Sequence, residues 1–324
     1  MKTNKIVVTP FPRVTTDAGI CDVARVSFAK TADQFTEDQN RGLLRYLAKN
    51  GHWSPFGHAR LIFVFRCKAD EMLPFFMGAQ LAGFTWGYST EYNEFCLNGS
   101  LWAFYENIQH LPSWSRATIM ETINREFPWS CPNLFSLDQF AVADDVSNPD
   151  RISYSGHELL LKREENAHLH YATFRVVAPI FLARQAVKHQ IHLCWNEESR
   201  RYIDEEPVYF EVDEWRGRPE KSMKQGSSGV IELPPELKAR VDAWGPAATA
   251  LYNDLLAAGV APELARAKLP LDLQVEWIWT GSVPAWKRIC RLRLDGHAQK
   301  EAQVFAQQVD AVMREEYAAI WDRL

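Results

Sequence analysis

Residues 37 to about 49 carry the spacing of an amphipathic helix. Thr36 and Gln39 make a capping box, three leucines follow at helical spacing, and an Asn-Gly pair ends the segment. The pattern predicts a helix with one buried face.

Two later segments alternate apolar and polar residues. After the turn-rich stretch 51–58, Leu61, Phe63 and Phe65 predict a strand with one buried face. A second strand is predicted over 172–177. It runs into Pro179, which suits the first turn of a helix from 179 to about 192.

About ninety residues rich in aromatic side chains separate these two strands. They predict a mainly helical insertion over about 70–165, with a loop at 144–150 where Asp, Ser, Asn and Pro gather. We interpret the block as an elaboration that packs on the core.

The last third of the chain predicts long helices and a further strand. A charged, glycine-rich loop is expected over 203–229 and a strand over 274–279. Helices are expected over 234–258, 286–294 and 297–323. Because strands and helices mix without regular β-α-β spacing, the fold class is predicted to be α+β.

Composition excludes several classes of protein. The formal net charge of -5 argues against a nucleic-acid-binding protein with a broad basic surface. The six cysteines include no C-x-x-C pair, so neither a zinc ribbon, another metal site nor a disulfide framework is expected. A cytoplasmic protein is expected, since we find neither a signal peptide nor about 18 uninterrupted apolar residues.

The densest polar cluster lies between Arg184 and Tyr202. On a helix, Arg184 and Lys188 share one face, while Gln185 and His189 share the next. Such a cluster fits either a phosphate site or a solvated helix face, and spacing alone leaves both open. Downstream lie Arg266, Arg288, Arg291, Arg293, His297 and Gln299, with the same two interpretations.

Both clusters resemble the flavin-dependent thymidylate synthase family. That family carries Arg-His-Arg, a short spacer and Asn-Glu-x-Ser-x-Arg-Tyr, and this chain has Lys188-His189-Gln190 followed by Asn196-Glu197-Glu198-Ser199-Arg200-Arg201-Tyr202. Further likenesses in family order are 24–28, 54–58, 178–185, 215–216 with 224–227, 264–270, and 292–293 with 297–299.

The resemblance implies that dUMP is methylated to dTMP, with methylenetetrahydrofolate as the carbon donor and FAD reduced by NADPH. It also implies one domain over residues 1–324, interrupted by the insertion, and a homotetramer that shares its active sites between subunits. A nucleotide and a folate are the expected partners, without nucleic acid or membrane.

The resemblance also assigns roles to residues. Arg293 would activate the pyrimidine, and His58 would act beside flavin and folate. The nucleotide would be bound by Gln185, Lys188, Glu197, Ser199, Arg200, Arg201, Arg266 and Arg293. The cofactor would be bound by His58, Lys188, His189, Gln190, Asn196, Ser282, Arg288 and His297.

This chain departs from the family pattern mainly at presumed flavin and folate positions. Lys188 and Gln190 replace two arginines, the following spacer is one residue longer, and Gly57 stands where a glutamate is usual. Ser282 and Pro284 stand where an asparagine and an arginine are expected. Two alternatives therefore stay open: C5 methylation or hydroxymethylation of UMP or dCMP, and a catalytically silent nucleotide-binding protein.

Overall fold

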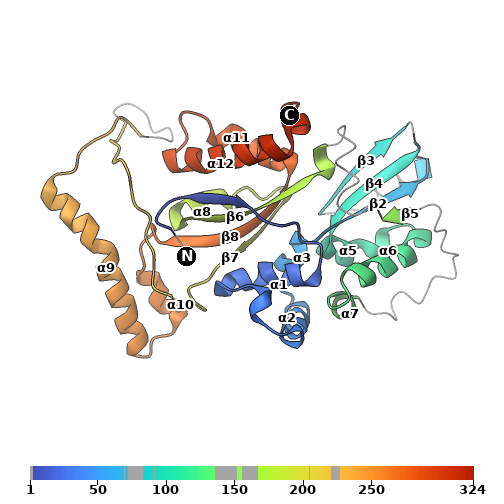
Figure 1. Ribbon diagram of the computed structural model, residues 1–324, viewed down its shortest axis with the longest axis horizontal. Coiled ribbons are helices and arrows are strands. Elements are labelled where there is room, and N and C mark those ends of the chain that lie inside the picture. The colour runs from blue at the N-terminus through green and yellow to red at the C-terminus, as the bar shows by residue number, and fades with distance from the viewer. Residues whose placement is uncertain are drawn as a thin grey trace.

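The computed structural model describes residues 3–68, 70–71, 83–90, 92–135, 152–154, 167–203, 205–219 and 227–324. These residues form an elongated molecule with two sheets (Figure 1). The larger sheet lies at the centre, the smaller sheet lies at one end, and a long helix stands at the other end (Figure 1). The α+β class predicted from the sequence is confirmed.

The central sheet is antiparallel throughout, in the order β1-β6-β8-β7. Its strands are β1 (Val7–Pro10), β6 (Tyr171–Pro179), β8 (Gln274–Ser282) and β7 (Leu193–Glu197). The strands expected over 172–177 and 274–279 are thus confirmed. Eight of nine residues in β8 are buried, as expected for a strand that is paired on both sides and covered on both faces.

One face of this sheet is covered by helices from the C-terminal half. They are α11 (Val283–Arg293), α12 (Lys300–Glu316) and α13 (Ala318–Trp321), and α8 (Ile180–Ala186) packs beside them. Trp277, Trp279 and Trp286 are fully buried in the core between the layers. Pro at the second position of α11 and the Ser282 cap fix where that helix begins.

The opposite face is covered near its centre by three N-terminal helices: α1 (Asp17–Arg25), α2 (Glu37–Lys49) and α3 (Ser54–His58) (Figure 1). The prediction for α2 is confirmed, including the reciprocal capping box of Thr36 and Gln39. The stretch 51–58, which we interpreted as turns, contains the short helix α3.

The smaller sheet adds strands that the sequence did not predict to an insertion whose described residues are otherwise mainly helical. Its strand order is β3-β4-β2-β5, all antiparallel, with β3 (Phe84–Ser89), β4 (Glu94–Ser100), β2 (Arg60–Arg66) and β5 (Ile152–Tyr154). The aromatic residues of β3 alternate with small or polar ones, which is strand spacing. Gly99 is required because a Cβ there would lie 2.3 Å from the Phe84 ring.

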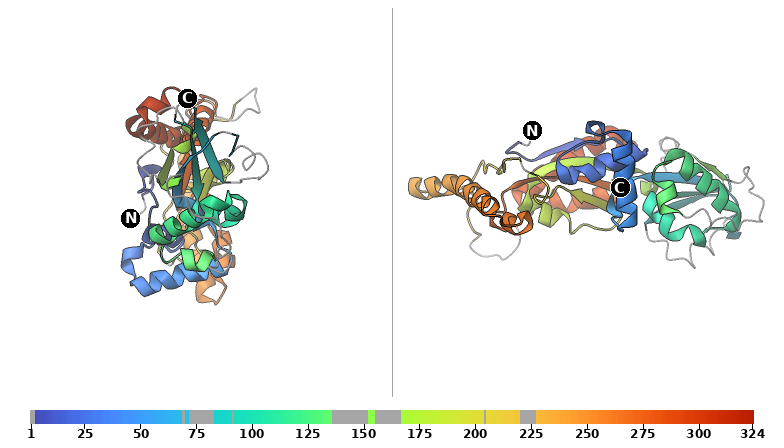
Figure 2. Two further views of the ribbon diagram at one scale, coloured as in Figure 1. Left: turned by 90° about the vertical axis from the view of Figure 1, so that its right-hand side faces the viewer. Right: turned by 90° about the horizontal axis from the view of Figure 1, so that it is seen from below.

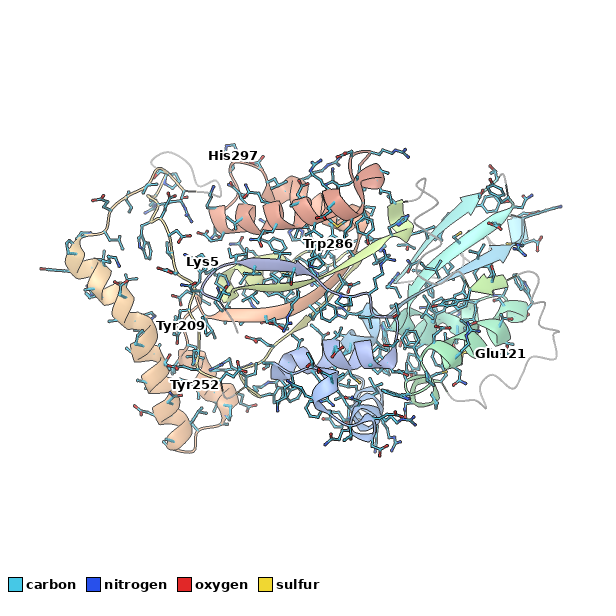
Figure 3. The ribbon with its side chains drawn as sticks, viewed as in Figure 1. Lys5, Glu121, Tyr209, Tyr252, Trp286 and His297 are labelled. Carbon is cyan, nitrogen blue, oxygen red and sulfur yellow. The ribbon has the colours of Figure 1, made fainter. Side chains whose placement is uncertain are left out.

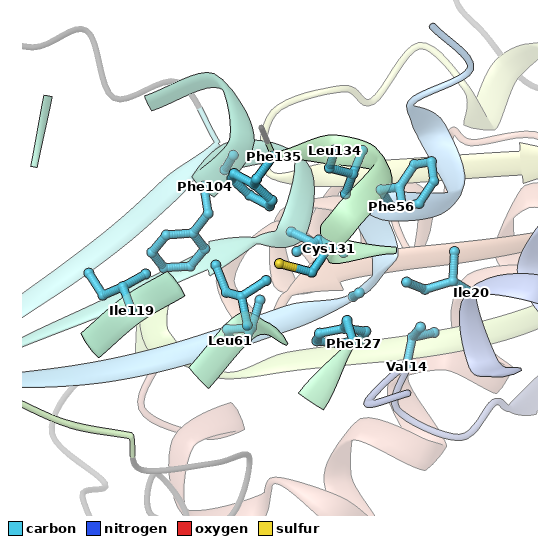
Figure 4. Packing of buried hydrophobic residues seen from close by; sticks show 14 of the residues in the cluster. Val14, Ile20, Phe56, Leu61, Phe104, Ile119, Phe127, Cys131, Leu134 and Phe135 are labelled. Carbon is cyan, nitrogen blue, oxygen red and sulfur yellow. The ribbon is translucent and has the colours of Figure 1, made fainter. Parts of the chain in front are cut away.

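Three helices do follow in this region and pack on the smaller sheet: α5 (Leu101–Asn107), α6 (Ser113–Glu126) and α7 (Cys131–Leu134). Their apolar side chains share one core with the N-terminal helices, as Figure 4 shows for Ile20, Phe56, Phe104 and Phe127. The aromatic-rich segment therefore packs on the core as expected. The loop predicted at 144–150 lies outside the described residues.

A long helix, α9 (Pro235–Ala257), stands away from the central sheet in Figure 1 and in the right-hand view of Figure 2. The short α10 (Pro262–Ala265) follows it, and α9 confirms the helix expected over 234–258. Described residues of 203–229 form mainly irregular chain with isolated bridges, in agreement with the predicted loop.

Two helix boundaries were predicted wrongly. The helix expected over 179–192 ends at Ala186, and the chain then turns through His192, at a φ of 58°, into β7. The helix expected over 297–323 begins at Lys300 and is interrupted at Tyr317, whose φ of -131° is not helical. Pairing of β7 with β8 places Trp195 opposite Trp279, a long-range contact that local spacing does not encode.

Candidate active site

A cavity of about 740 Å³ lies where α8 and the end of α11 face the irregular segment 205–219. Its walls carry four cationic side chains, Arg184, Lys188, Arg216 and Arg293, against two carboxylates. Arg216 and Glu301 form an ion pair with each other. The remaining cations give the cavity a positive potential that suits an anionic ligand.

Two arginines from distant segments converge on one hydroxyl group beside this cavity. The Ser199 Oγ accepts from Arg201 Nε at 3.3 Å and from Arg266 Nη1 at 3.2 Å. In the part of the chain that the structure describes, neither arginine makes an ion pair. Because Ser199 can still donate its hydroxyl proton, the three side chains offer donors to a single anion.

Glu197 connects this trio with the cavity. Its carboxylate pairs with Arg184 and accepts from Trp195 Nε1 at 3.1 Å, and Arg266 lies close enough to affect its charge. Burial nevertheless raises the pKa of Glu197, since loss of hydration outweighs the stabilising effects of Arg184, Trp195 and Arg266. The strand β7 thus carries the carboxylate that holds both groups of cations together.

Arg293 is held at the cavity wall by His189. An Nη2 proton of Arg293 points to His189 Nε2 at 3.1 Å. Burial lowers the pKa of His189, and the nearby Arg293 and Arg288 lower it further. His189 is therefore neutral near pH 7, so Nε2 can accept this bond while other guanidinium protons of Arg293 remain available.

Comparison with known proteins gives several matches. The family model described as thymidylate synthase complementing protein matches residues 158–317. A flavin-dependent thymidylate synthase of Aquifex aeolicus is 26% identical over 305 residues, which cover 90% of this chain and 92% of that protein. One from Streptomyces coelicolor is 34% identical over 160 residues, covering 47% of this chain and 63% of that protein.

The chain is thus similar to flavin-dependent thymidylate synthases, over nearly its whole length in one relative and over about its C-terminal half in the family model. The resemblance stated from its motifs is thereby confirmed. Among solved structures, a UMP/dUMP methylase from Streptomyces cacaoi bound with 5-Br UMP aligns with a TM-score of 0.46 and 17% identity, covering 98% of this chain and 92% of that one.

The family histidine, His58, is buried at the end of α3, with 1% of its surface exposed. Its Nδ1 lies 2.8 Å from Thr280 Oγ1, which in turn lies 2.8 Å from Thr173 Oγ1. Within the described residues, His58 Nε2 and the buried Asn196 Oδ1 have no hydrogen-bond partner. Burial lowers the pKa of His58 to about 3, against a smaller opposing effect of the Asn196 amide.

This buried histidine makes stability depend on pH. An unfolded histidine binds a proton below about pH 6.5 whereas folded His58 does not, so stability falls as pH decreases from 6.5 towards 3. We expect His58 to account for a loss of about 2 kcal/mol between pH 7 and pH 5. Urea unfolding of wild type and His58→Asn at both pH values measures this difference.

The control for that experiment is His110→Asn, because His110 is exposed. It should retain the pH dependence of the wild type. A His58→Asn variant that loses as much stability between pH 7 and pH 5 as the wild type would contradict the assignment.

The other expected cofactor residues are scattered over this protomer. Ser282 is buried, and its Oγ accepts from the Ala285 N–H at the start of α11. Arg288 donates to the Ile191 carbonyl at 2.9 Å, while Lys188 and Gln190 are exposed. His297 points away from the body of the molecule and bonds to Asp295 (Figure 3).

Of the expected nucleotide residues, Gln185, Lys188 and Arg293 line the large cavity, and Ser199, Arg201 and Arg266 form the trio beside it. Arg200 is instead buried, with its guanidinium 5.6 Å from the Tyr252 ring of α9. It therefore ties the signature segment to α9.

Sequence reasoning gave no role to Arg216, Glu301 or Thr280. Trp215-Arg216 was a family likeness, but its place in the cavity depends on the folding of an irregular segment. Gln299 bonds to Gln185 at 2.5 Å, which fixes both amides at the wall. Among the described residues, no group of three or more His, Cys, Asp or Glu could hold a metal ion.

Proposed function

We propose that this protein transfers a one-carbon unit from methylenetetrahydrofolate to carbon 5 of dUMP and forms dTMP, with FAD as cofactor and NADPH as reductant. The observation that carries the proposal is the Ser199, Arg201 and Arg266 trio beside a cationic cavity, in a chain similar to this family. The Aquifex aeolicus relative, which spans nearly the whole chain, is named a flavin-dependent thymidylate synthase.

The nucleotide phosphate carries roughly two negative charges near neutral pH. Bound to the trio, it would be neutralised by Arg201 and Arg266 and would accept the Ser199 hydroxyl proton. The pyrimidine would then extend into the cavity towards Gln185 and Arg293. The phosphate and the pyrimidine carbonyls would thus each face positively charged hydrogen-bond donors.

Carbon 5 of a uracil ring must become electron-rich before it can attack a one-carbon unit. Positive charge beside the ring carbonyls stabilises the enolate-like form that does so. Arg293 supplies this charge in our proposal, because neutral His189 orients its guanidinium without neutralising it. His189 is thus a positioning residue.

The residues present suit a flavin. His58 Nε2 and Asn196 Oδ1 are buried polar atoms without a hydrogen-bond partner among the described residues, and such atoms favour a polar ligand. We propose His58, His189, Asn196 and Arg288 as flavin contacts, with Lys188, Gln190 and His297 in contact through neighbouring subunits. The buried Ser282 instead caps α11 and takes no part in this proposal. A bound flavin would supply the hydride that converts the transferred carbon to a methyl group.

The test is direct. Purified protein should show a flavin absorbance band and should form dTMP from dUMP, methylenetetrahydrofolate and NADPH. Mass spectrometry of parallel reactions with UMP and dCMP distinguishes the other nucleotides and the hydroxymethyl product. Protein that takes up no FAD, even with dUMP present, would refute the proposal and leave a silent nucleotide-binding protein.

The phosphate trio yields a prediction of its own. Arg201→Ala and Arg266→Ala should each weaken dUMP binding by about 1.5–3 kcal/mol, because each removes a charge-assisted bond to phosphate. Isothermal titration calorimetry measures the effect. Arg314→Ala serves as the control, since Arg314 is exposed on α12 and pairs with Asp310. Unchanged dissociation constants in both variants would reject the phosphate assignment.

We further propose a cytoplasmic homotetramer of single-domain subunits, each carrying the 70–165 insertion, without a nucleic-acid or membrane partner. Self-association is supported by α9, where Leu237, Val241, Trp244 and Leu251 are exposed at helical spacing, Trp244 with 58% of its surface exposed. Among the described residues, no helix is long and apolar enough to cross a membrane.

The tetramer gives a prediction for α9. Trp244→Glu should shift the protein to smaller species, because a charge replaces a large apolar side chain in the expected contact. Light scattering coupled to size-exclusion chromatography measures the mass. A wild type that is itself monomeric would contradict the proposal.

A further inference from the structure

Arg60 lies at the junction of the two sheets, and its guanidinium is hydrogen-bonded only to neutral groups among the described residues. Its Nε donates to Asn98 Oδ1 at 2.9 Å, its Nη2 to the Asn98 carbonyl at 3.2 Å, and its Nη1 to the Gly83 carbonyl at 3.3 Å. The guanidinium also lies 4.0 Å from the centre of the Tyr171 ring. Among the described residues, no carboxylate forms an ion pair with Arg60.

This cation faces a cavity of about 170 Å³ formed by both sheets. The central sheet and its neighbours supply Gly57, Tyr171 and Cys194, and the aromatic-rich segment supplies Gly83, Ser100 and Trp102. Burial lowers the pKa of Arg60, which reflects the hydration that this guanidinium loses. An electron-rich ligand in the cavity would replace that hydration.

Trp102 gives the cavity a rigid aromatic wall. Its ring stacks on Trp53 with centroids 4.2 Å apart, and Tyr105 stacks on both rings, at 4.9 Å from Trp53 and 5.4 Å from Trp102. A side chain stacked against two other rings is held in place, and Trp102 lines the cavity. Such a wall favours a planar aromatic ligand.

The residue at position 57 explains why no carboxylate in this cavity neutralises Arg60. A carboxylate at this position would line the same cavity as Arg60. Here the residue is Gly57, and a Cβ would lie 2.6 Å from Cys194 Sγ, so this packing leaves no room for a larger side chain. The cavity therefore keeps its positive charge.

A second cavity of about 30 Å³ shares Arg60, Tyr171 and Thr280 with the first and is also lined by His58. The unpartnered Nε2 of His58 belongs to a side chain with 1% of its surface exposed. The Asn196 amide lies close enough to His58 to act on its pKa, and the two side chains form a buried polar pair next to the Arg60 cavity. The Arg60 cavity thus adjoins the histidine that the proposed reaction uses.

We propose that Arg60 and Trp102 bind a planar heteroaromatic ring through its face and a ring carbonyl, and that residues 83–102 thereby help to select the ligand beside His58. Pterin and flavin rings share this chemistry. At about 170 Å³ the cavity is smaller than the roughly 300 Å³ of a complete ligand site, so it takes the ring and leaves the rest of the ligand outside. This inference rests on the proposed function.

The experiment measures dissociation constants of folinic acid, FAD and dUMP for wild type, Arg60→Met and Trp102→Leu. Arg60→Met should weaken either folinic acid or FAD about 10- to 100-fold, and the ligand affected identifies the ring. The dissociation constant of dUMP should stay within about twofold of the wild type. Trp102→Leu should weaken the same ligand, and Trp102→Phe should restore most of the binding.

Arg66→Met is the matched control, because Arg66 lies at the other end of β2 with 62% of its side chain exposed. It should bind all three ligands like the wild type. Near-ultraviolet circular dichroism checks that each variant is folded, and Trp102→Leu decides the matter if Arg60→Met does not fold.

Three outcomes would overturn the inference. The first is wild-type binding of folinic acid and FAD by both variants. The second is a loss of dUMP binding in Arg60→Met as large as the loss for the ring ligand, which indicates a structural role. A wild type that binds neither FAD nor folinic acid refutes the proposed function, and this inference falls with it. The first two outcomes leave the proposed function intact.

Discussion

Replacing Arg293 by alanine is expected to lower turnover of dUMP by about 100- to 1,000-fold, the usual cost of losing one donor to a developing oxyanion. The guanidinium lines the large cavity and is oriented by His189. Its positive charge is needed most when the ring becomes electron-rich, so turnover should fall more than dUMP affinity does. Steady-state kinetics together with calorimetric binding of dUMP measures both quantities.

The matched control is Arg291→Ala on the same helix. Arg291 is exposed and bonds to the carbonyl oxygen of the C-terminal Leu324, away from the cavity. We expect wild-type turnover for this variant. If Arg293→Ala turns over dUMP as fast as the wild type, the activating role belongs to another residue.

Trp286→Ala should destabilise the folded protein by about 3–5 kcal/mol. Trp286 is fully buried between α11 and the central sheet (Figure 3), where its ring packs edge-on against Phe174 and Trp279 with centroids 4.8 and 5.0 Å apart. Its indole N–H also donates to the Ala172 carbonyl at 3.1 Å. The substitution leaves a large cavity and an unpaired carbonyl in β6.

Urea unfolding followed by circular dichroism measures this loss. Trp86→Ala is the control, since Trp86 on β3 is 45% exposed and stacks on Phe95 near the edge of the smaller sheet. It should cost about 1 kcal/mol or less. Equal losses for the two variants would show that the core around Trp286 does not govern stability.

Short-range sequence patterns predicted the helices and strands that are defined by their own residues and not by pairing with distant parts of the chain. The capping box at Thr36 and the leucines that follow located α2 to the residue, and apolar alternation located β2 and β8. The hairpin that β3 and β4 form within the aromatic-rich segment was not predicted. Aromatic residues occur in both helices and strands, and only the pairing of β4 with β2 decided between them.

The candidate site was predicted unevenly for a similar reason. A motif identifies residues that relatives use, and so Gln185, Ser199, Arg201, Arg266 and Arg293 could be named from the sequence. Their partners could not be named, because they lie far away along the chain. Thr280 is 222 residues from His58, and Arg266 is 67 residues from Ser199.

The polar segment from Arg184 to Tyr202 shows what the sequence determined and what the tertiary structure decided. The sequence by itself determined its composition, its resemblance to a known family and the helix that begins it, because these follow from residue types and their spacing. The tertiary structure decided that the helix ends at Ala186 and that Leu193–Glu197 becomes a strand. Only pairing with β8 stabilises so short a strand, and that pairing places Glu197 between Arg184 and Arg266.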